Sequence, residues 1–123
     1  MLHETWAYEE GSERLLTVAN FEKAADMHAA VRDAYARAAE SIRADGIIPC
    51  GDAMIKAAEM GAKVHRDTFH ASLGVGRYLL ALTWLRTLTG CDITENAFSA
   101  FAAPVSEEER RIAIAAVNEA TAK

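Results

Sequence analysis

The segment with the most chemical content is Arg66–Ser72, in which Asp67 precedes His70 by three residues. On a loop that leads into a helix, this spacing lets one rigid turn present both side chains to the same place. The carboxylate can then accept the Nδ1–H of the imidazole, which fixes the tautomer and leaves Nε2 free to take a proton from a nucleophile. The pattern predicts the base half of a Ser-His-Asp arrangement.

The same residues also have less specific explanations. Asp and Ser are common where a loop enters a helix, because their side chains cap free backbone N–H groups. A second alternative is a metal cluster of His65, Asp67 and His70. A metal site needs three or four converging ligands with supporting contacts, and a His-x4-His spacing on a loop is a weak signal of one. We therefore expect no metal.

The elements that must position this segment begin with a strand–helix–strand unit. Aromatic and β-branched residues predict a short strand over residues 2–8, and Ile47-Ile48 before Pro49 predicts a second strand. Between them, apolar residues at intervals of three and four predict a helix with Asn20 as its N-cap and an end at Asp45-Gly46. That stripe consists of Phe21, Ala24, His28, Val31, Tyr35, Ala38 and Ile42. Two strands joined in this way run parallel.

Three further helices are expected after the second strand. A short helix spans residues 52–60 and ends at Gly61, and a loop over residues 61–71 follows it. Ser72 is expected to cap a long apolar helix that ends at Thr89, with Gly74 and Gly76 allowing close backbone approach near its start. After an irregular stretch over residues 91–105, the capping box Ser106–Glu109 predicts the start of a final helix.

Composition excludes several function classes. The chain has 123 residues, the length of a single domain, and a formal net charge of −5, so phosphate neutralisation and a nucleic-acid partner are not expected. Its longest strongly apolar stretch, residues 79–85, falls well short of the roughly 20 residues of a membrane span. The N-terminus has no signal-peptide pattern, and two cysteines make no disulfide framework, so the cytoplasm is the default location.

Two other features are candidates for function. Trp6 and Tyr8, at the end of the first predicted strand, are candidate substrate-binding residues because aromatic faces stack on carbohydrate; core packing is the alternative. Cys50, near the start of the second predicted helix, lies where a helix dipole lowers a thiol pKa. A small buried residue at the end of a strand is the better interpretation of Cys50.

The order of these motifs resembles the C-terminal block of the SGNH (GDSL-type) hydrolase superfamily. The segment Thr5-Trp6-Ala7-Tyr8 looks like a strand-end segment of one branch of that superfamily, and residues 47–53 resemble its strand and helix start before the Asp-His loop. The block itself is similar in Asp67, His70, Ser72, Gly74, Gly76, Tyr78 and the helix that ends in Leu88-Thr89-Gly90. The resemblance covers about residues 3–90.

The resemblance implies a fold and a reaction. The fold is a partial three-layer α/β/α domain of the flavodoxin-like, SGNH hydrolase type, with a short, mostly parallel sheet and about four helices. Residues 1–123 would be a single α/β domain, the C-terminal part of a hydrolase domain. The reaction is hydrolysis of acyl or acetyl esters by a Ser-His-Asp mechanism, with His70 as general base and Asp67 as its orienting partner. Its substrate is a small-molecule or carbohydrate ester, and no metal or organic cofactor is implied.

The sequence departs from the family in one respect. The Gly-Asp-Ser-type turn that carries the nucleophile is absent, as are the Gly and Asn blocks of the oxyanion hole. None of the available serines lies in such a turn; they are Ser12, Ser41, Ser72, Ser99 and Ser106. Because triad members act as a unit, we expect little or no esterase activity from this chain alone.

The alternative function is non-enzymatic. A sheet of two or three strands with few helices has an open edge and an uncovered face, so we expect self-association or a partner chain that covers the sheet. A truncated remnant of this kind would act as an interaction or assembly module. An active site predicts the Asp67–His70 pair in an open cleft, whereas a scaffold predicts the same surface covered by a partner or by the C-terminal helix.

Overall fold

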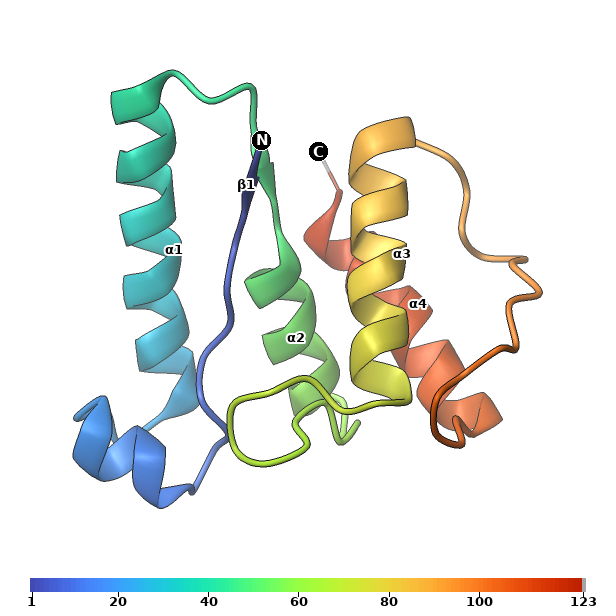
Figure 1. Ribbon diagram of the computed structural model, residues 1–123, viewed down its shortest axis with the longest axis horizontal. Helices are drawn as coiled ribbons and strands as arrows, with labels where there is room; N and C mark the ends of the chain where they lie inside the picture. The colour runs from blue at the N-terminus through green and yellow to red at the C-terminus, as the bar shows by residue number, and fades with distance from the viewer. Residues whose placement is uncertain (123) are drawn as a thin grey trace.

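The computed structural model describes residues 1–122 and shows a mostly helical domain with one small parallel sheet. Two of the helices, α1 and α3, both contact β2, and the strands lie between them (Figure 1). Within the described residues, none of the helices combines the length and apolar character needed to cross a bilayer. In chain order the elements are β1 (Leu2–His3), the π-helix η1 (Arg14–Val18), α1 (Ala24–Ile42), β2 (Ile47–Ile48), α2 (Cys50–Glu59), α3 (Val75–Thr89) and α4 (Glu107–Ala120).

The parallel pairing of the two strands is confirmed, but the strands are shorter than expected. Leu2 pairs with Ile47 and His3 with Ile48, and Glu4 N–H still donates to Ile48 O at 3.1 Å. The ladder ends there because α2 begins at Cys50, and the backbone groups that follow β2 make hydrogen bonds within that helix. Residues 4–8 therefore continue as an extended segment without a strand beside them in the described part of the chain.

Both expected ends of the first long helix are wrong. Asn20 does not cap α1; it has a positive φ of 61°, and the helix begins at Ala24. The Ala24 N–H is instead bound by Glu10 Oε2 at 2.6 Å, from a residue that lies before η1 in the chain. At the other end, Arg43 takes the left-handed conformation, with φ 54°, in place of Gly46. A carboxylate brought in by the tertiary fold replaces the local cap.

The apolar stripe of α1 is only partly used. Ala24 is buried, and Val31 and Tyr35 are half-buried. The later stripe residues Ala38 and Ile42 are exposed, contrary to expectation. Since α1 packs mainly against α2 and β2, the far half of its stripe has no element to pack against in the described part of the chain.

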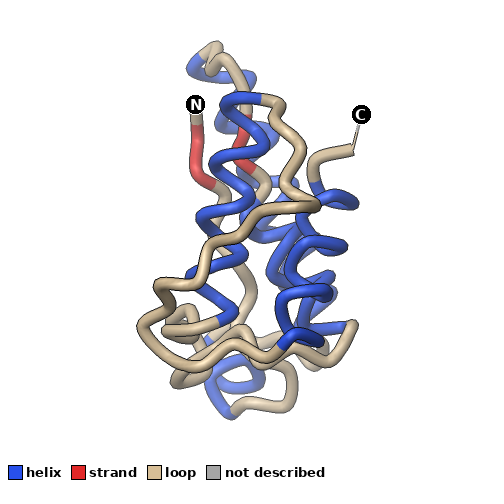
Figure 2. The backbone as a smooth tube through the Cα atoms, turned by 90° about the vertical axis from the view of Figure 1, so that its right-hand side faces the viewer, coloured by secondary structure: helices blue, strands red, loops and turns tan. Residues whose placement is uncertain are grey.

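The core lies between α2, α3 and α4, which pack against one another. Its fully buried side chains include Met54, Leu79, Ile93 and Val117. The capping box predicted at the start of α4 is present, with Ser106 Oγ accepting from Glu109 N–H and the Glu109 carboxylate accepting from Ser106 N–H. Residues 91–105 are irregular, as expected, and run back along the helices from the end of α3 to the start of α4 (Figure 2).

Close backbone approach at the start of α3 is confirmed. A Cβ atom at Gly76 would lie 2.6 Å from Val64 O, and one at Gly74 would lie 2.9 Å from Pro104 O. Both neighbours are backbone atoms, which cannot move as a flexible side chain can. Gly76 thus lets α3 press directly on the loop that carries Asp67 and His70.

We predict that Gly76→Ala lowers the free energy of unfolding by about 1–3 kcal/mol, the usual cost of overpacking. The matched control is Gly46→Ala, where the new Cβ would meet only the flexible Met1 side chain, with its sulfur at 3.2 Å. Urea unfolding followed by circular dichroism measures both variants. Equal losses in the two variants would show that the approach of α3 to Val64 is not tight.

Candidate functional site

The structure brings Asp67 and His70 into direct contact. His70 Nδ1–H donates to Asp67 Oδ2 at 2.7 Å, which leaves Nε2 as the free ring nitrogen. The side chains of His70 and Asp67 are 51% and 43% exposed, respectively. Their loop lies at the end of the molecule opposite the two termini (Figure 1). The pair is therefore open to a ligand or to another protein segment.

A tight turn sets the orientation of this dyad. Asp67 Oδ1 accepts from the backbone N–H groups of His70 at 2.9 Å and of Phe69 at 3.4 Å. Between them, Thr68 has a positive φ of 84°, an unfavourable conformation for a β-branched residue. Backbone strain of this kind persists only where the surroundings enforce it, and it is common at functional sites.

The surroundings that enforce the turn are the residues that follow β1. Phe69 O accepts from Trp6 Nε1–H at 2.6 Å, and Thr68 O accepts from Glu9 N–H at 2.8 Å. At the start of the loop, the buried His65 donates its Nε2–H to Ala7 O at 2.9 Å. The dyad loop is thus bound to residues 6–9 through both backbone and side-chain groups.

Aromatic packing adds a second layer of contacts around the dyad. The Phe69 ring lies 3.9 Å from the His70 imidazole, centre to centre, and packs edge-on against Tyr8 at 6.3 Å. The guanidinium carbon of Arg14 lies 4.3 Å from the Phe69 ring centre. The contact between Arg14 and Phe69 was not predicted from the sequence, because no local spacing links η1 to the loop.

Ser72 belongs to the helix and not to the dyad. Its Oγ accepts from Gly76 N–H at 2.8 Å, and its carbonyl oxygen accepts from Arg77 N–H at 3.0 Å. Ser72 is nevertheless not the N-cap, contrary to expectation: α3 begins at Val75, its N-cap is Gly74, and the Ser72 hydroxyl reaches the first turn from two residues before the cap. With its hydroxyl bound to the helix, Ser72 is not placed as a nucleophile.

Trp6 and Tyr8 line a cavity of about 370 Å³ beside the dyad loop. Its walls come from the segment after β1, the start of α1, α2 and the beginning of the loop, and Ile55, Ala62 and Val64 are among its apolar residues. Trp6 also packs against the core, so the alternative of core packing applies to this residue as well as its position in the cavity wall.

The ionisation of Asp67 follows from its contacts. The hydrogen bonds from the His70 side chain and backbone hold the pKa of the carboxyl well below its ordinary value of 3.8. Asp67 is therefore a carboxylate throughout the neutral range, as a partner that orients and stabilises an imidazolium must be.

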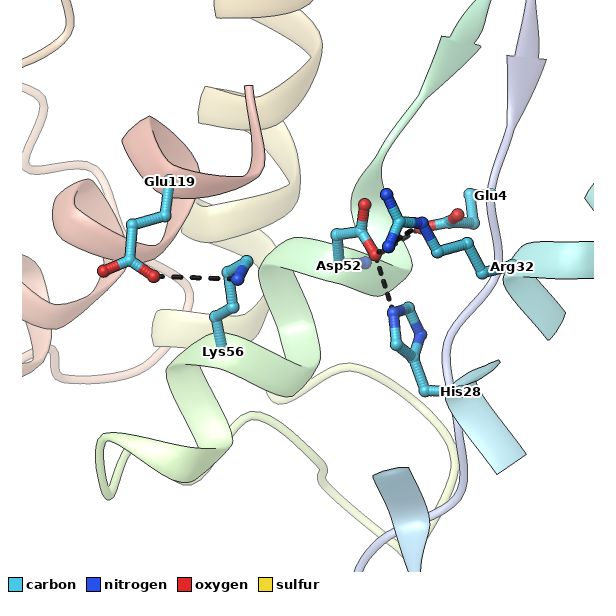
Figure 3. A network of polar contacts seen from close by, with 6 residues as sticks. All are labelled: Glu4, His28, Arg32, Asp52, Lys56 and Glu119. Carbon is cyan, nitrogen blue, oxygen red and sulfur yellow. Dashed lines mark hydrogen bonds and ion pairs between the residues drawn. The ribbon is translucent and has the colours of Figure 1, made fainter. Parts of the chain in front are cut away.

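A second polar cluster joins β1, α1 and α2. His28 Nε2–H donates to Asp52 Oδ1 at 2.6 Å, and the nearly fully buried Glu4 accepts from Asp52 N–H through Oε1 at 2.8 Å (Figure 3). Arg32 Nε lies 3.8 Å from Asp52 Oδ1. Burial raises the pKa of Glu4. Burial also acts to raise the pKa of Asp52, but the hydrogen bond from His28 and the nearby cations outweigh it and lower this pKa.

The side chains of this cluster bind one another, and they also bring three groups of metal-ligating type together. One ligand atom each from Glu4, His28 and Asp52 lie within 4.8 Å of one another, the one such group in residues 1–122. The Asp52 oxygen is already bound to His28, and the Arg32 guanidinium occupies the position of a counter-ion. The alternative ligand set His65, Asp67 and His70 does not converge in the described part of the chain.

Cys50 is not a reactive thiol. It is completely buried, and burial raises its pKa to about 12, with the Glu4 carboxylate adding to the effect. The position at a helix start does not offset the loss of solvent. The interpretation of Cys50 as a small buried residue is confirmed, whereas Cys91 is exposed.

Comparison with known proteins places the whole chain in one family. Residues 1–120 match the family model described as "Domain of unknown function (DUF4886)". The crystal structure of a DUF4886 family protein from Bacteroides uniformis ATCC 8492 matches 96% of this chain with a TM-score of 0.84 and 30% sequence identity. The chain spans 46% of that solved protein. No curated protein matches the sequence.

We predict that the Asp67 carboxyl titrates with a midpoint below the ordinary value of 3.8. Because its folded-state pKa is depressed, its contribution to stability is present above the unfolded value and is lost as pH falls through the folded value. A carbon-13 NMR titration of the side-chain carboxyl measures the midpoint directly. In His70→Ala the midpoint should rise toward 3.8; an unchanged midpoint would mean that the hydrogen bond to His70 is not formed in solution.

Proposed function

The chain belongs to the DUF4886 family, and we propose that it carries the general-base half of an SGNH-type ester hydrolase. The observation that carries the proposal is the 2.7 Å hydrogen bond between His70 Nδ1–H and Asp67 Oδ2, with Nε2 left free at an open surface. Geometry of this kind is what a Ser-His-Asp mechanism requires of its base.

The arrangement of elements supports the same proposal. Two parallel strands contacted by α1 and α3 are the pattern expected for part of a three-layer α/β/α domain. The dyad loop lies against residues 6–9, which follow the carboxyl end of β1. Ligands of open α/β sheets bind at the carboxyl ends of the strands.

In the proposed mechanism, His70 acts through Nε2 in both halves of the reaction. It takes the proton of a serine hydroxyl as the oxygen attacks the ester carbonyl, and it then returns that proton to the leaving alcohol. Water attacks the acyl-serine in the second half, and Nε2 takes its proton as the base. The bond between the acyl carbon and the serine oxygen then breaks, the carboxylic acid is released, and the serine oxygen takes the proton back from Nε2. Asp67 stays ionised and stabilises the imidazolium.

The nucleophile of this proposal lies outside the 123 residues. No serine of the chain lies in a Gly-Asp-Ser-type turn, and the hydroxyl of Ser72 is bound to α3. The substrate class is a small-molecule or carbohydrate ester. Trp6 and Tyr8 are candidates for its binding surface because they line the cavity beside the loop.

We predict that the 123-residue chain hydrolyses p-nitrophenyl acetate no faster than its His70→Asn variant, because a base without its nucleophile accelerates little. In the longer Bacteroides protein, we expect fluorophosphonate labelling of one serine. Replacing the residues aligned with His70 or Asp67 by Asn should lower kcat/KM by about 10³-fold or more.

Two results would contradict the proposal. One is the absence of any fluorophosphonate-reactive serine in the Bacteroides protein. The other is labelling and turnover that do not change when the residues aligned with His70 and Asp67 are replaced. Circular dichroism of each variant serves as the control for folding.

A second candidate function, an interaction or assembly module, is favoured by the outer face of α3. Trp84, Leu85 and Leu88 are 41%, 44% and 55% exposed, an unusual amount of apolar surface for one helix. Trp84 also donates its Nε1–H to His3 Nδ1 at 3.0 Å, so this face borders β1. A partner covering it would also reach the edge of the sheet.

We predict that the chain self-associates at high concentration and that Leu88→Lys shifts it toward monomer, because a buried charge without a partner opposes docking. Val18→Lys, at an apolar residue that is 62% exposed on η1, is the matched control and should leave the association unchanged. Light scattering after size exclusion measures both. A wild-type monomer at all concentrations would count against the assembly module.

A further inference from the structure

Beside the dyad lies a cation that the proposed mechanism does not use, the guanidinium of Arg14. Its carbon atom lies 4.3 Å from the centre of the Phe69 ring and 5.6 Å from that of Tyr8. The same Phe69 ring lies 3.9 Å from the His70 imidazole. Arg14 and His70 therefore pack against one aromatic side chain, so a molecule bound at one of them is close to the other.

The Arg14 guanidinium has no anionic partner within residues 1–122. No carboxylate among these residues lies within 4.0 Å of it, and its Nε is buried without a hydrogen-bond acceptor. Three of the acidic residues in the neighbouring segments are bound elsewhere: Glu9 to Lys63 at 2.8 Å, Glu10 to Ala24 N–H at 2.6 Å, and Asp67 to His70.

The unpaired guanidinium lowers the stability of the folded chain. A buried donor without an acceptor costs free energy, and folded proteins contain few of them. The backbone at Arg14 is nevertheless held in place, because the side chain of the next residue, Leu15, is completely buried. Arg14 is also the first residue of η1, and single π-helical turns are frequent at functional sites.

We propose that Arg14 binds an anionic group, a carboxylate or a phosphate, of the molecule that the dyad acts on. A planar guanidinium held over an aromatic ring presents its N–H groups in a fixed fork, which matches the two oxygens of such an anion. The ester as the reacting group rests on the proposed function; recognition of the anion by Arg14 does not.

Arg66 is the competing cation because it also lies on the dyad loop. Its side chain is exposed, and its backbone N–H donates to His70 O at 2.8 Å. It takes no part in the stack on Phe69 among the described residues. Arg66→Gln is therefore the matched control for Arg14→Gln, with the same change of charge on the same side of the molecule.

The test is an NMR titration of the 123-residue chain with phenylacetate, phenyl phosphate and the neutral phenylacetamide. We expect one or both anions to shift the Arg14 Nε–H and the His70 ring resonances, and the neutral amide to shift neither. Arg14→Gln should weaken the binding by about tenfold and Arg14→Lys by less, since Lys keeps the charge but loses the fork. Arg66→Gln should change it by less than about twofold.

The two anions identify which group is recognised, and each remaining outcome decides the proposal. If neither anion moves the Arg14 resonance in the wild-type chain, Arg14 is not an anion site. If Arg66→Gln weakens binding as much as Arg14→Gln, the effect is general surface charge and the proposal is overturned. Because no step requires ester cleavage, anion binding at Arg14 would stand even if the Bacteroides protein showed no activated serine.

Discussion

The position of the dyad depends on the docking of its loop against the residues that follow β1. Three hydrogen bonds make this contact, from Trp6, Glu9 and His65. They join parts of the chain that are separated by about 60 residues, with separations of 63 for Trp6 and Phe69 and 58 for His65 and Ala7. Each such bond contributes only about 0.5–1.5 kcal/mol. Together they hold Thr68 in an unfavourable conformation and set the direction in which His70 points.

Close backbone approach at two glycines makes this docking possible. Gly51, at the start of α2, lies so near Thr5 that a Cβ atom there would overlap the Thr5 carbonyl oxygen, and Gly76 brings α3 onto Val64. The segment after β1 and the base of the loop are thus each pressed against a helix. The buried cluster of Glu4, His28 and Asp52 then joins α1 to the same segment (Figure 3). Rigid elements on several sides position a loop that is itself exposed.

The exposed face of that loop combines two chemistries within a few residues. In the proposed function the Asp67–His70 pair is the base, and the Arg14 guanidinium, which contacts the same Phe69 ring as His70, is a charge without a partner in the described chain. A base needs only its carboxylate to be oriented, so it is complete within four residues. The proposed recognition of a charged ligand needs a cation beside the dyad, and that cation, Arg14, comes from η1 in a distant part of the sequence.

Local patterns in the sequence determined the parts of this protein that depend on near neighbours. The turn with Asp67 and His70, the capping box of α4 and the order of strand, helix and strand were all predictable because their contacts lie within a few residues or follow from chain connectivity. Only the tertiary structure decided the start of α1, the shortness of both strands and the stack around Phe69. In those cases the deciding group is far away in sequence: Glu10 displaces the local cap Asn20, and Arg14 reaches a ring that no periodicity links to it. Long-range contacts of this kind arise from tertiary packing, and they produce no regular spacing in the sequence from which they could be predicted.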